Sequence, residues 1–463
     1  MLTQCFIVSP LPPISPYRNR LGNYPLRCFI VLTALWASCS WSVAGAGELT
    51  VKEIPGIDAR AQDSIDGLDF TIVDGQLHAV WLESVASPAQ NESRFQIWHR
   101  QLNLSNEHWG IPSSLPQRAR GPLRVAAVEG RLQVFVGPHL QHFQLSASNT
   151  WESLPDALPS ASAIALGIAT DGPNAILFYL TRIRSGGNPG VEDSVEVWTA
   201  TSGRGGIRSR IRLAKFPGGP TQPEPKLLIV HGTYHLFAAI NRVAKASNDD
   251  LLSEDSRIVY IYSRDKGKTW SSPQVLGVLG IQGHHARPEG SGYVSHLDAV
   301  YLNKQFLVLY NASWLYMLAS PDAQRWSDPS VLVGARTWVG AARNSSVAIA
   351  SEGDRGAVFW VDERYQRTDA SPLNPLGLHW LADPDWENND VLTIPLSVLR
   401  DRALAKKPNP VRLTRDLSYA ERIRALALHG RCYALWTGRG KVGRELDSYG
   451  KPPTIFLISM PAK

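Results

Sequence analysis

Arginine and other charged side chains are concentrated in a few segments that lie between apolar runs of the chain. A guanidinium group pairs with a carboxylate through two parallel hydrogen bonds, so grouped arginines favour the binding of an acidic ligand. The polar residues of these segments are Asp58, Arg60, Asp63, Asp66, His284, His285, Arg287, Glu289, Arg343, Asn344, Asp362, Glu363, Arg364, Tyr365, Glu421, Arg422 and Arg439. The elements that hold these segments decide whether their charges converge.

Two segments contain residues of the types that bind metals. His284 and His285 supply half of a metal site, but no partner follows at a regular spacing. The acidic residues 248–255 offer oxygen ligands of the kind that Ca²⁺ prefers, without the regular spacing of an EF-hand loop. We expect both segments to be solvated loops, and we predict no metal and no cofactor for the protein. Binding of Ca²⁺ by the acidic segment stays open.

A hairpin pattern repeats along the chain. Each copy has an apolar run, a short turn and a second apolar run that ends in aromatic residues, as in residues 70–81 and 227–237. The second runs of the seven copies begin near residues 74, 129, 174, 232, 303, 356 and 430. A pattern that returns at such spacing is typical of repeat architectures.

A second signal adds two more strands to each repeat. A tryptophan followed closely by proline comes after another apolar run, at Trp109, Trp151, Trp270 and Trp326. Four-stranded units at roughly 40–50-residue spacing are the blades of a propeller. The sequence therefore predicts an all-β fold, a β-propeller of four-stranded antiparallel blades. We favour seven blades, with six as the alternative if one of the weaker repeats is an elaboration.

The two ends of the repeat region complement each other. The last unit has strands at residues 423–436 and 454–459 and then stops, while residues 48–54 form a lone strand. Pairing of this N-terminal strand with the C-terminal blade would remove an open sheet edge. We therefore expect the ring to be closed by that pairing.

One turn carries a specific motif. Residues 263–270 read Ser-Arg-Asp-Lys-Gly-Lys-Thr-Trp, which matches the Asp-box, or bacterial neuraminidase repeat; a shorter copy follows at residues 320–326. The chain thus resembles the sialidase superfamily. The motif residues are expected to be structural: aspartate binds turn amides, glycine permits positive φ and tryptophan packs between sheets. They are Ser263, Asp265, Gly267, Thr269 and Trp270 in the first copy, and Ser320, Asp322 and Trp326 in the second.

The resemblance also implies a site. Sialidases clamp a carboxylate with three arginines and use a tyrosine nucleophile, a glutamate that activates it and an aspartate acid/base. On this pattern Arg60, Arg287 and Arg343 form the clamp, Tyr365 with Glu363 supplies the nucleophile, and Asp63 is the acid. Further ligand-binding candidates are Glu289, Arg364 and Arg422. The family's Arg-Ile-Pro motif is replaced by Arg-Ala-Gln from residue 60.

The geometry of a propeller assigns these candidates to one face. Successive strands of a blade alternate in direction. The turn between the first and second strands and the turn between the third and fourth strands therefore lie on one face of the propeller. The loops between the second and third strands, and those between blades, lie on the opposite face. The long loops, including residues 182–193, 241–257, 362–377 and 397–419, belong to the second face. Binding groups concentrate in long loops on a rigid scaffold. We expect the ligand on that face, opposite the Asp-boxes.

The N-terminus has the pattern of a signal peptide. Three arginines precede an uncharged apolar run at residues 28–43, and Ala44-Gly45-Ala46 suits a signal peptidase. We expect residues 1–46 to be removed, with an uncleaved membrane anchor as the alternative, and residues 47–463 to form one propeller domain. The protein is then periplasmic or secreted. Only Cys432 remains in the mature chain, which excludes an internal disulfide.

The net charge of the chain limits the classes of molecule that it is expected to bind. The chain has 47 basic and 41 acidic residues, and the leader holds three of the basic ones, so the mature net charge is about +3. Nucleic-acid binders usually show a stronger basic bias. Two functions stay open: an exported propeller that binds a glycan or other acidic ligand, including a sialidase-like exo-glycosidase, and a non-catalytic binding or assembly propeller for a protein partner. A monomer is expected.

Overall fold

The chain divides into two units, Met1–Glu48 and Leu49–Lys463. The computed structural model describes residues 51–54, 65–85, 94–155, 162–184, 193–203, 206–219, 222–245, 252–280, 294–312, 314–333, 346–362, 390–400, 410–414, 419–439 and 454–463. The predicted leader lies outside these residues. Within the described part, no helix is long and apolar enough to cross a membrane.

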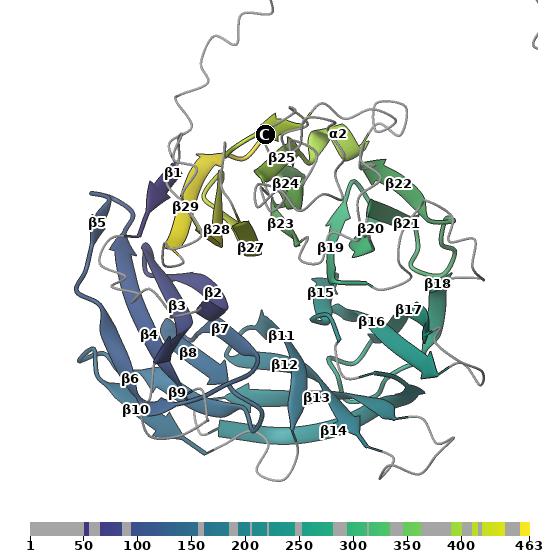
Figure 1. Cartoon of the computed structure of the whole chain (residues 1–463), viewed down its shortest axis with the longest axis horizontal. Helices are drawn as coiled ribbons and strands as arrows, with labels where there is room; N and C mark the ends of the chain where they lie inside the picture. The colour runs from purple at the N-terminus through teal and green to yellow at the C-terminus, as the bar shows by residue number, and fades with distance from the viewer. Residues whose placement is uncertain are drawn as a thin grey trace, which may run out of the picture. The chain divides into compact units, whose positions relative to one another are not determined.

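Seven antiparallel sheets form a ring in the second unit, with one strand of each sheet at the centre (Figure 1). Residues of these inner strands line a cavity, and the space that they enclose is called the channel. Each sheet is one blade, so the seven-bladed prediction is confirmed and the six-bladed alternative is wrong. The innermost strands, in blade order, are β2 (Ile65–Val73), β7 (Leu123–Val128), β11 (Ala163–Asp171), β15 (Lys226–Val230), β19 (His296–Leu302), β23 (Val347–Glu352) and β27 (Tyr419–Leu428).

Three further strands complete each blade. The second strands are β3 (Gln76–Val85), β8 (Arg131–Val136), β12 (Asn174–Ile183), β16 (Thr233–Lys245), β20 (Gln305–Ala312), β24 (Arg355–Asp362) and β28 (Arg431–Arg439). The third strands are β4 (Arg94–Asn103), β9 (Gln141–Leu145), β13 (Ser194–Gly203), β17 (Leu252–Ser263), β21 (Trp314–Ser320), β25 (Asp390–Pro395) and β29 (Thr454–Pro461). The outer strands are β5 (His108–Trp109), β10 (Trp151–Leu154), β14 (Gly206–Pro217), β18 (Gln274–Gly280), β22 (Ser330–Val333), β26 (Val411–Arg412) and β1 (Val51–Glu53), and β6 (Ser113–Arg118) also pairs with β4.

The ring closes as the sequence predicts. β1 pairs with β29, with Val51 opposite Ile458 and Glu53 opposite Phe456. The seventh blade is therefore built from both ends of the second unit. Its outer edge would otherwise be the third strand, β29.

Local sequence explains the hairpins between first and second strands. In the first blade the two turn residues, Asp74 and Gly75, have φ of 49° and 74°. Two positive φ values in succession match the right-handed twist of the flanking strands, and glycine reaches them without steric cost. Glu129 and Gly130 repeat this conformation in the second blade.

Apolar side chains fill the space between neighbouring blades. One buried cluster joins strands of the fifth and sixth blades, including Leu309, Trp360 and Leu392. The two sheet faces of each blade are thus packed against other sheets, which leaves the inner strands to line the channel.

The sixth blade differs from the sequence prediction. Residues 397–419 were expected to be a single loop between blades. They contain the outer strand β26 and the short helix α2 (Ser397–Arg400), in which Leu399 is buried. No tryptophan lies between β25 and β26 in the sequence, so the outer strand could not be recognised by the tryptophan–proline pattern.

Candidate functional site

Most of the predicted ligand-binding and catalytic residues lie outside the described part of the chain. They are Arg60, Asp63, Arg287, Glu289, Arg343, Glu363, Arg364 and Tyr365. Arg422 is described: it lies in β27, is partly buried and has φ of 52°. The pairing of β27 with β28 shifts register between Glu421 and Arg424, so Arg422 lies in a bulge. The clamp and the catalytic set stay predictions.

The Asp-box residues bind one another in the turn between β17 and β18. Asp265 accepts hydrogen bonds from the Thr269 amide (2.8 Å), the Thr269 hydroxyl (2.6 Å) and the Ser263 hydroxyl (2.8 Å). These bonds, with those of Thr269 first, lower the pKa of Asp265 to about 2. The Trp270 indole donates to the Gly267 carbonyl at 3.0 Å and its ring meets Phe178 of the preceding blade edge-on. The contacts are those of a turn that joins blades.

In the shorter box the aspartate again accepts turn amides, but from residues two and three positions after it. Asp322 accepts the amides of Gln324 and Arg325, both at 2.9 Å, and the Trp326 indole donates to the Ala323 carbonyl at 3.2 Å. Ala323 lies three residues before its tryptophan, as Gly267 does in the first box, and it adopts the left-handed region with φ of 59°. Neither box adjoins the channel pocket described next.

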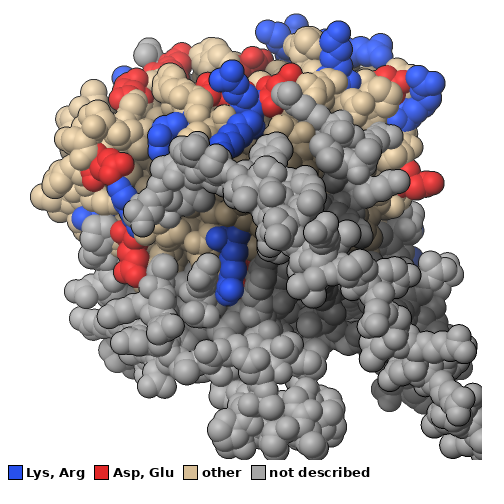
Figure 2. Space-filling view, turned by 90° about the horizontal axis from the view of Figure 1, so that it is seen from above, with Lys and Arg blue, Asp and Glu red and all other residues tan. Residues whose placement is uncertain are grey.

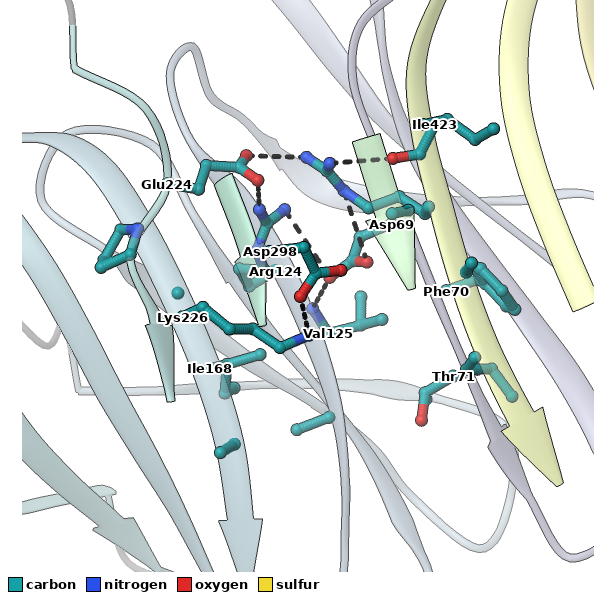
Figure 3. Close-up of a pocket in the computed structure, with 18 of the residues that line it drawn as sticks. Asp69, Phe70, Thr71, Arg124, Val125, Ile168, Glu224, Lys226, Asp298 and Ile423 are labelled. Atoms are coloured by element: carbon teal, nitrogen blue, oxygen red, sulfur yellow. Dashed lines mark hydrogen bonds and ion pairs between the residues drawn. The ribbon is translucent and has the colours of Figure 1, made fainter. Parts of the chain in front are cut away.

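A pocket of about 300 Å³ lies in the central channel and is lined by all seven inner strands (Figure 3). One position recurs in every inner strand, four residues before its end at the hairpin turn. The residues at this position are Asp69, Arg124, Gly167, Lys226, Asp298, Ala348 and Arg424. Five of the seven are charged, although inner strands are mostly apolar. The ring of blades therefore brings charges from five distant segments to one level of the channel.

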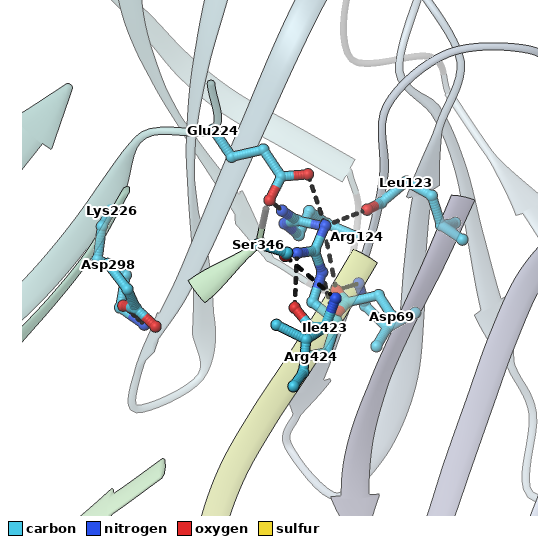
Figure 4. Close-up of polar contacts among 10 residues, drawn as sticks. Asp69, Leu123, Arg124, Glu224, Lys226, Asp298, Ser346, Ile423 and Arg424 are labelled. Carbon is cyan, nitrogen blue, oxygen red and sulfur yellow. Dashed lines mark hydrogen bonds and ion pairs between the residues drawn. The ribbon is translucent and has the colours of Figure 1, made fainter. Parts of the chain in front are cut away.

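Two arginines of this ring converge on one carboxylate (Figure 4). Arg424 Nη2 lies 2.7 Å from Glu224 Oε1, and Arg124 forms an ion pair with the other carboxylate oxygen. Asp69 lies farther away, 3.9 Å from Arg124 and 3.8 Å from Arg424. A separate pair joins Lys226 Nζ to Asp298 at 2.6 Å.

The two aspartates of the ring also bind backbone amides of the next blade. Asp69 accepts the Val125 amide at 2.9 Å, and Asp298 accepts the Ile349 amide at 2.7 Å. Val125 and Ile349 each follow the ring position of their own strand. The same arrangement thus links the first blade to the second and the fifth to the sixth, which gives both aspartates a structural role.

Glu224 reaches the ring from outside the strands. It precedes β15, and the neighbouring Gln222 donates its side-chain amide to the Gly219 and Asn241 carbonyls, at 3.0 Å and 2.8 Å. Pro225 crosses β11 at Gly167, where a Cβ would lie 1.9 Å from the Pro225 carbonyl oxygen. Glycine at the ring position of the third blade therefore admits the segment that carries Glu224.

Burial sets the electrostatics of the two arginines. The side chains of Arg124 and Arg424 are 9% and 17% exposed, against 31% for Glu224. Burial, and secondly the Arg424 charge, lowers the pKa of Arg124 to about 9. Burial also lowers the pKa of Arg424. Both arginines stay protonated at neutral pH, and their positive charge needs an anion close by.

The arrangement is suited to anion binding. Paired guanidinium groups at a pocket wall hold carboxylates through charge-assisted hydrogen bonds. No group of three or more histidine, cysteine or acidic residues that could hold a metal ion occurs among the described residues. On the part of the outer surface that Figure 2 draws in colour, by contrast, basic and acidic side chains lie among one another.

The sequence reasoning missed this cluster because it looked for charges in loops. Asp69, Arg124 and Asp298 lie inside strands that are mostly apolar, although the strand of Asp69 contains a second acidic residue, Asp66. Aligning the seven hairpins on their turns would have placed these charges at one level. Glu224 has no such signal, since its position depends on the path of the chain before β15.

Comparisons with known proteins give likenesses in fold only. No protein-family model matches the chain, and no curated protein matches its sequence. A solved mutant of Trypanosoma rangeli sialidase with trans-sialidase activity matches with 9% identity and a TM-score of 0.40, covering 85% of this chain and 54% of that one. The chain thus spans about half the length of that sialidase.

Other solved structures match over most of their own length. The polysaccharide lyase Uly1 has 9% identity and a TM-score of 0.46, with 86% of this chain and 89% of that one covered. The GH93 α-L-arabinofuranosidase of Fusarium graminearum, solved with arabinobiose, has 13% identity and a TM-score of 0.43, with 89% and 97% covered. These likenesses are in fold alone and assign no activity to this chain.

Proposed function

We propose that this protein binds an acidic glycan, or another acidic ligand, in the pocket of its central channel. The observation that carries the proposal is the convergence of Arg124 and Arg424 on one carboxylate at the pocket wall. A guanidinium pair that holds a carboxylate of the chain has the chemistry to hold that of a ligand. The pocket volume of about 300 Å³ lies at the lower end of the range of roughly 300–1,000 Å³ for small-molecule sites.

The position of the pocket supports the same proposal. Glu224 lies at the end of the channel where the outer strand of one blade connects to the inner strand of the next. Long loops that contain the predicted Arg287 and Arg343 make this kind of connection. Those loops can add contacts to a ligand whose carboxylate is held in the channel.

Hydrolysis is the catalytic form of the proposal. In that form the protein is a sialidase-like exo-glycosidase, with Tyr365 as nucleophile, Glu363 as its base and Asp63 as the acid. Release of the chromophore from a chromogenic sialoside, lost in Tyr365→Phe, would support it. Ligand binding without any turnover would leave the binding proposal and exclude the enzyme.

Calorimetric titration of the purified mature protein tests the binding. Sialyllactose and a trigalacturonate are the acidic probes, and lactose is the neutral probe. We expect an acidic probe to bind, and Arg424→Gln to weaken that binding at least tenfold. Arg355→Gln is the matched control, because Arg355 is exposed near a hairpin turn away from the pocket. Equal binding of lactose, or no binding of either acid, would contradict the proposal.

Export belongs to the same proposal. The arginines, apolar run and small residues of segment 1–46 support cleavage and release to the periplasm or the medium. N-terminal sequencing of the protein from the extracytoplasmic fraction is expected to begin at or near Gly47. Recovery of the chain in membranes with residue 28 onwards intact would favour the uncleaved anchor.

A protein partner is the second candidate, and one feature favours it. β14 is an outer strand of 12 residues that exposes Arg208, Arg210, Arg212 and Lys215. A long basic sheet edge can pair with an acidic strand of another protein, although charge at an edge also protects against aggregation. Stable co-purification of an acidic partner, lost when Arg210 and Lys215 are replaced by glutamate, would support this candidate over the first.

A further inference from the structure

The charges at the channel pocket balance one another. Three cations and three anions meet there among the described residues. The cations are Arg124, Lys226 and Arg424, and the anions are Asp69, Glu224 and Asp298. A site with this balance offers no net attraction to an anionic ligand while all six side chains stay in place.

The three anions are not equivalent. Asp69 and Asp298 lie on strands, and each binds a backbone amide of the next blade. Glu224 precedes a strand, and its partners among the described residues are the two arginines. Its side chain is also the most exposed member of the arginine cluster, at 31%. Glu224 can therefore leave the cluster without breaking a backbone hydrogen bond.

Asp69 cannot replace Glu224. At 3.8–3.9 Å from the two guanidinium groups it lies beyond hydrogen-bonding distance, and its Oδ2 accepts the Val125 amide. The Nε of Arg424 has no hydrogen-bond partner. If Glu224 moved away, two buried guanidinium groups would face the pocket, and the pocket charges would sum to about +1. That state calls for one monoanion.

We propose that Glu224 is an internal latch: its carboxylate occupies the anion site, and a monoanionic ligand such as a sugar acid binds by displacing it. This inference rests on the proposed function, since it names the charge of the ligand and the residue that controls its entry. A ligand that binds only the unlatched state has its affinity reduced by the fraction of molecules in that state. The latch therefore weakens ligand binding, and it favours ligands that carry a single negative charge, as the carboxylate of Glu224 does.

Two variants open the latch by different routes. Glu224→Gln removes the charge that competes with the ligand. Gly167→Ala keeps the charge but adds a Cβ where the Pro225 carbonyl now lies, and so pushes the segment away from the ring. Glu152→Gln, an exposed position on β10, is the control for the loss of one negative charge.

Acetate is the minimal carboxylate probe, and N-acetylneuraminic acid is the sugar-acid probe. Their affinities for the mature protein are measured by calorimetry and by the ligand-dependent rise of the unfolding midpoint. We expect Glu224→Gln to bind acetate at least tenfold more tightly than the unmodified protein, and Gly167→Ala to change in the same direction. Adding Arg424→Gln to Glu224→Gln should abolish the gain, and Glu152→Gln should show none.

The outcomes separate the latch from the proposed function. If neither opened variant binds acetate more tightly, the latch is wrong, even if the protein binds acidic glycans. If both gain acetate affinity but no acidic glycan binds any form, the latch stands and the glycan form of the proposed function is wrong. Circular dichroism verifies folding, and if Glu224→Gln does not fold, Gly167→Ala decides alone.

Discussion

Asp298 accepts the backbone amide of Ile349 at 2.7 Å and so joins the inner strands of the fifth and sixth blades. The inner edge of a blade has no further strand to pair with, and a buried amide there needs another acceptor. Asp298 also accepts the Ala299 amide at 2.7 Å and pairs with Lys226. The Asp298 side chain thus holds two neighbouring blades together and also contributes a negative charge to the pocket.

Replacing Asp298 by alanine should destabilise the propeller. The Ile349 amide would lose its acceptor, and Lys226 its counter-ion, so we expect the free energy of unfolding to fall by about 2–3 kcal/mol. Asp298→Asn keeps an oxygen acceptor and should lose less. Urea denaturation followed by tryptophan fluorescence measures both. Equal losses for alanine and asparagine would show that the amide bond is not the main contribution.

A buried histidine pair should make the protein sensitive to acid. His78 Nδ1 lies 3.0 Å from His99 Nε2, and burial lowers the pKa of His78 to about 4 and that of His99 to about 3. The charge of His78 further lowers the pKa of His99. A histidine of the unfolded chain has a pKa of 6.5, so between pH 6.5 and pH 4 the unfolded state binds more protons than the folded state. The free energy of unfolding therefore falls as the pH falls through this range.

The size of this effect can be measured on one histidine. Each buried neutral histidine contributes a slope of about 1.4 kcal/mol per pH unit in that window. His99→Gln should remove about one such slope from the unfolding free energy measured between pH 6.5 and 4. His108→Gln, at an exposed position on β5, is the matched comparison. An unchanged slope in His99→Gln would contradict a buried neutral pair.

Loss of the closing strand should open the ring. A chain that begins at residue 55 lacks β1 and leaves β29 as the edge of the seventh blade. Exposed strand edges pair with other chains. We expect a lower unfolding midpoint and soluble aggregates in size-exclusion chromatography, compared with a chain that begins at residue 47. A monodisperse shortened chain of unchanged midpoint would show that closure by β1 is dispensable.

Cys432 should be inert in the folded protein. It is buried within β28, and burial raises the pKa of its thiol to about 11, so little thiolate forms at neutral pH. A disulfide reagent such as dithiobis-nitrobenzoate should give no colour with the native mature chain and one equivalent in guanidinium chloride. The full chain has four cysteines, so a count above one in denaturant would show that the leader is retained.

The sequence was most informative where structure is local and repeated. The two-residue hairpin turns, the complete Asp-box and the lone N-terminal strand each appear in the pattern of neighbouring residues, and all take the expected place in the seven blades. The outer strand of the sixth blade was missed because β26 has two residues and no tryptophan. Short strands leave too little periodicity to detect.

By itself, the sequence determined a propeller closed by its N-terminal strand and favoured seven blades over six, because each blade is specified by its own turns and apolar alternation. Only the tertiary structure decided which charges meet. Arg124 and Arg424 are 300 residues apart, and Glu224 lies between them in the chain, yet the ring brings all three to one pocket wall. The physical reason is that closure of the ring brings the same position of every inner strand to one level of the channel. Gly167 then leaves room for Glu224, a carboxylate that reaches this level from outside the described strands.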